Sequence, residues 1–223
     1  TVLDRRGEHP SIADLGTQII GALAIGGQPL AQHRMACARE RIGGEMMRML
    51  ALPKVARTLA AMTAIGLLAL GEEAVPLLLA YEEMGGQSVA SRLVLLGLAT
   101  DDLQASWRLP TDLVKAAGLI GKAADLLARD EIAAAAYRYG EAAVEGLAVA
   151  AAREGWSRDR LGEAARELGR MVVPPFPVTG HDLADLGIAP GPALGQELAR
   201  LEDTWINSRF ALSKIELLSL VTR

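Results

Sequence analysis

The residue type that most limits the fold of this chain is alanine, closely followed by leucine. Together they supply 74 of the 223 residues, whereas the β-branched residues valine, isoleucine and threonine supply only 32. Alanine and leucine rank among the best helix formers, and β-branched residues favour strands. No segment sustains the alternation of apolar and polar residues that a half-buried strand needs. The sequence therefore predicts an all-α fold, a multi-helical bundle array with a small helical unit at the C-terminus.

Breaks in the helical spacing divide the chain into segments. An acidic break from Thr100 to Asp102 marks the end of a first bundle, and three prolines between Val172 and Pro177 predict an extended linker. The predicted segments are 1–27, which stays unassigned, 28–100 as the first bundle (body), 101–170 as the second bundle, and 171–223 as linker and tail unit.

Apolar spacing and helix-breaking residues predict the helices of the first bundle. One helix runs from about Leu30 to Ala51 and stops before Pro53, because the residue before proline disfavours the helical conformation. The next helix ends near Gly66 and is expected to bury a single face. That face consists of Val55, Leu59, Met62 and Ile65.

Caps and spacing predict the later helices in the same way. Thr111 is the expected N-cap of a helix that ends at Arg129. A single helix is expected over 132–153, followed by a charged, solvated helix that Ser157 caps. The tail is expected to hold a short helix over 182–186 opened by Asp182, a helix ending near Ile206, and a last helix starting at Ser213. Each of these predictions depends on a local signal.

The sequence lacks the motifs of common catalytic sites. It has no G-x-S-x-G, C-x-x-C, G-x-G-x-x-G or P-loop pattern. The histidines His9, His33 and His181 lie far apart, and none has a metal-ligand spacing with Cys37. We therefore predict no catalytic residue, no metal ligand and no cofactor in this chain.

The single cysteine bears on the location of the protein. Cys37 cannot close an intrachain disulfide, so we expect a buried thiol in a reducing cytoplasm. No apolar stretch reaches the ~18 residues that a membrane-spanning helix needs, and the N-terminus does not resemble a secretory signal. The sequence predicts a soluble cytoplasmic protein without membrane contact, and it leaves the oligomeric state open.

Charge is distributed unevenly along this mildly acidic chain. Residues 28–60 carry six basic residues against two acids, Glu40 and Glu45, whereas residues 61–105 carry six acids and only Arg92. Adjacent acids such as Glu82 and Glu83 diverge on a helix and are interpreted as solvated surface. The basic segment consists of Arg34, Arg39, Arg41, Arg48, Lys54 and Arg57. It is a candidate contact for phosphate, although a solvated helix face or an intramolecular pair of Arg41 with Glu45 explains it as well.

A second candidate contact lies at Gly191. Pro190, Gly191 and Pro192 lead into a predicted helix whose first N–H groups are free to receive a backbone phosphate. The alternative is that this region is only a compact packing unit.

Two stretches carry more information than composition does. The first is ERIGGEMMRML at residues 40–50, followed by LAAMTAIGLL at 59–68, and the second is GHDLADLGIAPGPALG at 180–195. They resemble the E-R-I-x-x-E-[LM] helix and the G-x-D-L-x-x-x-G-I-x-x-G-P-x-[IL]-G signature of the bacterial CCA-adding tRNA nucleotidyltransferase and poly(A) polymerase family. WRLP at 107–110 and AYRYG at 136–140 are similar to two further segments of its C-terminal helical half.

The resemblance implies the body and tail of such an enzyme, which would hold the backbone of the tRNA acceptor arm. The family's catalytic head uses a Gly-Ser pair and an Asp-x-Asp that binds magnesium, and its neck uses a Glu-Asp-x-x-Arg segment. The sequence contains none of the three. We therefore expect the chain alone to be inactive and magnesium to belong to a head that precedes Thr1. A headless RNA-binding or scaffold protein, and the equivalent part of a poly(A) polymerase, stay as alternatives.

Overall fold

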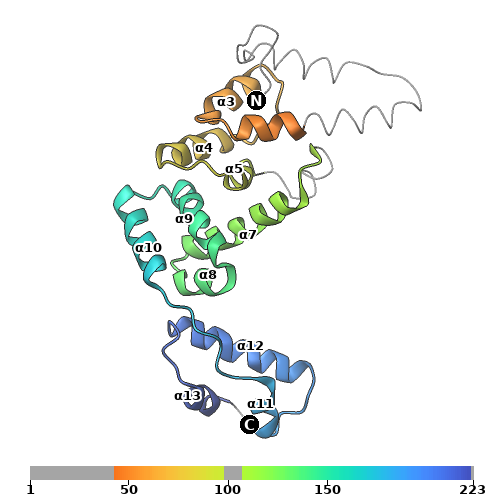
Figure 1. Cartoon of the computed structure of the whole chain (residues 1–223), viewed down its shortest axis with the longest axis vertical. Helices are drawn as coiled ribbons and strands as arrows, with labels where there is room; N and C mark the ends of the chain where they lie inside the picture. Colours follow the sequence, from red (N-terminus) through yellow and green to blue (C-terminus); the bar gives the residue numbers. More distant parts are fainter. Residues whose placement is uncertain (1–42, 98–106, 222–223) are drawn as a thin grey trace, which may run out of the picture.

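The described part of the chain is entirely helical. The computed structural model describes residues 43–97 and 107–221, and within these ranges it contains helices, turns and irregular segments but no strand (Figure 1). This confirms the all-α fold class. The predicted division into two bundles stays a prediction, as does everything expected of residues 1–42.

The N-terminal described region contains four helices, the first of which is described from residue 43 onward. They are a helix over 43–50, α3 (Val55–Ala64), α4 (Ala74–Glu83) and α5 (Val89–Leu95). As predicted, the first of them ends before Pro53. Ser88 caps α5 by accepting a hydrogen bond from the Ser91 N–H. The prediction for α3 was wrong at one position, because Ile65 lies just past the helix end and its residue surface is 75% exposed.

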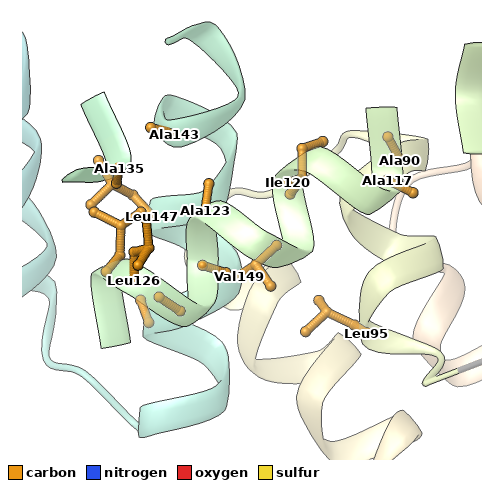
Figure 2. Close-up of a cluster of buried hydrophobic side chains, with 14 of the residues drawn as sticks. Ala90, Leu95, Ala117, Ile120, Ala123, Leu126, Ala135, Ala143, Leu147 and Val149 are labelled. Carbon is orange, nitrogen blue, oxygen red and sulfur yellow. The ribbon is translucent and has the colours of Figure 1, made fainter. Parts of the chain in front are cut away.

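The middle region contributes many of the buried residues of the hydrophobic core. It contains α7 (Thr111–Ala128), α8 (Ile132–Tyr139), α9 (Glu141–Glu154) and α10 (Arg158–Arg170). Helices α7 and α9 pack along their length through small side chains such as Ala117, Ala123 and Ala143 (Figure 2). A Cβ added to Gly146 would lie 3.1 Å from the Ala123 Cβ, so the glycine allows this close approach.

Three predictions for the middle region need correction. The expected single helix over 132–153 is broken at Gly140, where φ is 49° and ψ is −120°, a conformation open to glycine and costly for other residues. Thr111 is inside α7, whose N-cap is Pro110. Helix α10 does begin after the Ser157 cap, but it buries Ala164 and Leu168 and packs against α8 and α9, so it is not a free connector.

The tail unit follows an irregular segment over 171–179, in agreement with the predicted linker. It contains α11 (Gly180–Asp185), α12 (Pro192–Asn207) and α13 (Lys214–Ser219), and Figure 1 shows it at the far end of the molecule from α3. The cap of α11 differs from the prediction. Thr179 is the N-cap, and Asp182 is the third helical residue, whose carboxylate accepts a hydrogen bond from the Thr179 N–H.

Candidate nucleic-acid interface

The structure describes half of the predicted basic segment. Arg34, Arg39 and Arg41 lie outside the described residues. Arg48, Lys54 and Arg57 lie within them, on the helix over 43–50, the turn that follows, and α3. All three are exposed to solvent.

Arg48 forms an ion pair on its own helix. Its Nη1 lies 2.5 Å from Glu45 Oε1, and the Arg48 side chain is 73% exposed. Such exposed pairs contribute little to stability, because water and salt screen them. The predicted partner of Glu45 was Arg41, which is not described. Arg48 is therefore held near the helix end without being buried, and its guanidinium stays accessible to an anion.

Lys54 and Arg57 stand at the beginning of α3. Lys54 is the N-cap residue with a φ of 56°, in the left-handed region, and Arg57 is the third residue of the helix. The first turn of α3 contains no acidic residue. Two exposed cations this close together create a positive potential that attracts anions.

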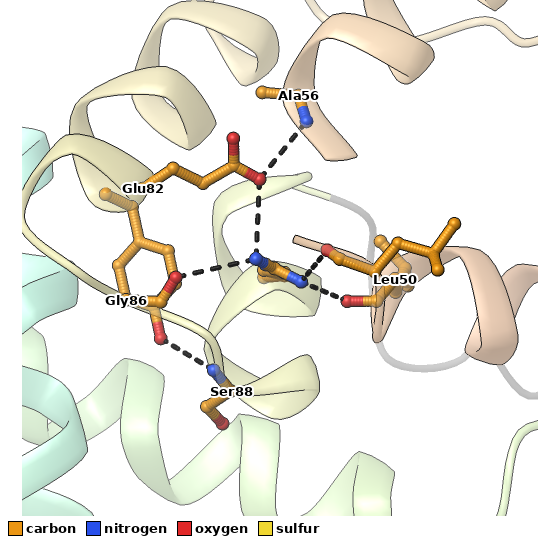
Figure 3. A network of polar contacts seen from close by, with 8 residues as sticks. Leu50, Ala56, Glu82, Gly86 and Ser88 are labelled. Atoms are coloured by element: carbon orange, nitrogen blue, oxygen red, sulfur yellow. Dashed lines mark hydrogen bonds and ion pairs between the residues drawn. The ribbon is translucent and has the colours of Figure 1, made fainter. Parts of the chain in front are cut away.

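The buried centre of this region is Arg92 on α5, which sequence reasoning assigned no role (Figure 3). Only 1% of the residue is exposed. Its guanidinium donates hydrogen bonds to the carbonyl oxygens of Leu50, of Leu52 at 2.8 Å, and of Gly86 at 3.5 Å. A single side chain thus binds the end of the helix over 43–50 and the segment after α4.

Glu82 on α4 completes this network. Its Oε1 lies 3.4 Å from Arg92 Nη2 and accepts a hydrogen bond from the Ala56 N–H at 3.2 Å. The Glu82 side chain is 9% exposed, so its interpretation as solvated surface was wrong. Glu82 supplies the negative charge that the first turn of α3 lacks. A signal was present in the sequence, because Arg92 is a lone cation in an apolar helix and needs an acidic partner if buried.

The second candidate, Gly191, lies at the start of α12. Its φ of 153° and ψ of −167° belong to a region that only glycine occupies readily. Pro192 is the first helical residue, no side chain caps the helix start, and the first turn contains no acid. The N-terminus of α12 therefore has the features that suit an anion.

The charges around Gly191 favour the binding of an anion less than those around α3. The tail's cations Arg200, Arg209 and Lys214 each lie within 2.8 Å of a carboxylate. The structure also keeps the two candidate contacts apart, because α3 and the tail unit lie at opposite ends of the molecule (Figure 1). An RNA that touches both has to extend along the molecule.

The described ranges offer neither a metal cluster nor a membrane span. Across 43–97 and 107–221, no three histidine, cysteine, aspartate or glutamate side chains gather as a metal site would require. None of the helices described is both long enough and apolar enough to cross a bilayer.

Comparison with known proteins connects part of the chain to a family. No protein-family model matches the chain. Over 57 residues the chain is 47% identical to CCA tRNA nucleotidyltransferase 1, mitochondrial, from Danio rerio. Over 58 residues it is 40% identical to the Mus musculus protein and 38% identical to the Homo sapiens protein of the same name. Each match covers 26% of this chain and 13% of the relative. These matches, over about a quarter of the chain, thus support the family that the sequence resembles.

Proposed function

We propose that this chain is the body and tail portion of a CCA-adding tRNA nucleotidyltransferase. It holds the backbone of the tRNA acceptor arm while a head domain outside this chain adds nucleotides to the 3′ end. The observation that carries this proposal is the 38–47% identity to three CCA tRNA nucleotidyltransferases over 57–58 residues. A bacterial form of the enzyme and a cytoplasmic location stay predictions, and the relatives are mitochondrial by name. Magnesium belongs to the proposed head.

Two features of the described residues support binding to an RNA backbone. Arg48, Lys54 and Arg57 are exposed around one turn, against the single acid Glu45 between 43 and 60. Lys54 and Arg57 stand at the N-terminus of α3, and the uncapped start of α12 at Gly191 offers a second, weaker contact. Backbone phosphate is the RNA group that such cations and helix starts bind without reading sequence.

A salt titration of tRNA binding tests the proposal. The variant Arg48→Gln, Lys54→Gln, Arg57→Gln removes three cations from the candidate interface. Its control, Lys115→Gln, Lys122→Gln, Arg170→Gln, removes three exposed cations elsewhere and has the same net charge. Each phosphate contact adds about 0.9 to the slope of log affinity against log salt on a duplex. We expect the interface variant to bind tRNA more weakly with a flatter slope, and the control to remain close to the parent.

The outcomes separate the proposal from its alternatives. An equal loss of tRNA affinity in both variants means that binding depends only on the net charge of the protein. Unchanged affinity in the interface variant means that the three cations are only solvated. Either result overturns the proposed interface. Single-stranded oligoadenylate serves as a second RNA, and tighter binding to it than to tRNA would favour the poly(A) polymerase alternative. Helical content by circular dichroism confirms that each variant is folded.

A further inference from the structure

The turn over 51–54 is fixed from inside the molecule. On the first side of the turn, the carbonyl oxygens of Leu50, just before it, and of Leu52, within it, accept hydrogen bonds from the Arg92 guanidinium. After it, the Ala56 N–H donates to Glu82 Oε1, which also pairs with Arg92. The four turn residues are exposed, so none of their side chains anchors the turn in the core. The Arg92 and Glu82 pair is thus the connection between the two sides of the turn.

The cation at the end of this turn has an unfavourable backbone conformation. Lys54 has a φ of 56°, which costs free energy in any residue with a Cβ. Such a conformation persists only where the surroundings hold it. The neighbouring hydrogen bonds of Arg92 and Glu82 provide that restraint.

Packing alone does not explain an arginine at position 92. Burying a guanidinium is costly, and an apolar side chain of similar volume fills a core as well or better. Arg92 instead directs its planar donors to three backbone carbonyls and a carboxylate. Because the two buried charges cancel, the pair adds nothing to the net charge that an RNA meets.

We infer that Arg92 and Glu82 are positioning residues, which set the relative placement of Arg48, Lys54 and Arg57 for contact with neighbouring phosphates of an RNA backbone. This inference rests on the proposed function and assigns a part of the binding to residues that touch no RNA. Arg92 fixes the helix end that follows Arg48. Glu82 fixes the helix start that carries Arg57. Lys54 lies between the two fixed points.

The variant Arg92→Met, Glu82→Gln tests the inference, because it removes the pair without changing net charge. The substituted amide at position 82 keeps an acceptor for the Ala56 N–H, and methionine keeps a long unbranched side chain at position 92. We expect tRNA affinity to fall roughly tenfold at ~0.1 M salt and the slope to flatten by about 0.9, as the loss of one phosphate contact predicts. Helical content should remain that of the parent.

Two further variants make the result decisive. Arg92→Lys keeps a buried cation but lacks the planar fork, so it should show the same flattened slope to a smaller degree. If the double variant loses helical content, the tRNA binding of Arg92→Lys tests the inference in its place. A folded variant with parental affinity and slope overturns the positioning role. If Arg48→Gln, Lys54→Gln, Arg57→Gln also binds like the parent, the proposed interface itself fails, and the two failures are distinct.

Discussion

At the scale of single residues, Gly43 and Gly44 show how adjacent glycines differ. Gly43 is buried, and a Cβ placed on it would lie 1.7 Å from the Trp107 carbonyl oxygen. Nothing lies within 4 Å of the same position on Gly44. Both belong to the helix over 43–50. Gly43 therefore allows the helix to touch the backbone at Trp107, whereas Gly44 only weakens the helix.

This difference predicts opposite effects of two alanine substitutions. Gly43→Ala should lower the free energy of unfolding by about 1–3 kcal/mol, because the added methyl group forces the helix away from Trp107. Gly44→Ala should raise it by about 0.5–1 kcal/mol, because alanine is the better helix former. Urea unfolding followed by circular dichroism measures both. Equal effects of the two substitutions would mean that the contact at Trp107 does not restrain the helix.

At the scale of helices, local signals in the sequence located several helix starts, but they assigned the wrong N-caps to α7 and α11. Ser157 caps α10 as predicted, and α13 follows Ser213, where the last helix was expected to start; both signals involve only the next three residues. The break at Gly140 was missed because apolar spacing continues on both sides of it. The network of Arg92 was missed because its partners come from three separate segments. Spacing along one helix cannot reveal contacts between helices.

The contact between α11 and α13 predicts a pH dependence. Lys214 Nζ lies 2.7 Å from Asp182 Oδ1, and the backbone and hydroxyl of Thr179 donate to the other oxygen. The bond from Lys214, followed by those from Thr179, lowers the pKa of Asp182 from 3.8 to about 2. Because the pKa is lower in the folded than in the unfolded chain, the ionised carboxylate stabilises the tail above about pH 4. That stabilisation is lost as the pH falls from about 4 to about 2.

Acid titration of the tail measures this effect. The fluorescence of Trp205, which is buried in α12, should report loosening of the parent between about pH 4 and 2. Asp182→Asn should remove that step and lower the stability at pH 6, because the ion pair is absent at every pH. Asp185→Asn removes an exposed acid from the same helix and should retain the step. An unchanged acid transition in Asp182→Asn would contradict the assignment.

At the scale of the whole molecule, AYRYG at 136–140 attaches the tail to the rest of the chain. The Tyr137 ring on α8 meets Trp205 on α12 edge-on, with 5.5 Å between ring centroids. Its hydroxyl donates to Glu202 at 2.7 Å, and this bond raises the pKa of Tyr137. The neighbouring Arg138 pairs with Asp203 at 2.5 Å. The order of helices was predictable from the sequence, but this attachment joins residues 65 positions apart and was not.

Substitutions at Tyr137 should separate the two kinds of contact that hold the tail. Tyr137→Phe keeps the ring and loses one hydrogen bond, so it should cost about 1 kcal/mol. Tyr137→Ala also loses the packing against Trp205 and Phe210 and should cost about 3–5 kcal/mol. Cleavage by thermolysin at the buried Val178, which becomes accessible only when the tail opens, reports release of the tail.

The rate of cleavage also bears on RNA binding. We expect Tyr137→Ala to be cut faster than Tyr137→Phe and to lose any contribution of Gly191, because a released tail no longer holds the start of α12 at a fixed distance from α3. The contact at Arg48, Lys54 and Arg57 should remain, since it lies at the other end of the molecule. If Tyr137→Ala is cut no faster than the parent, other contacts suffice to hold the tail. The pair of Arg209 with Glu167 on α10, at 2.8 Å, is then the next to remove.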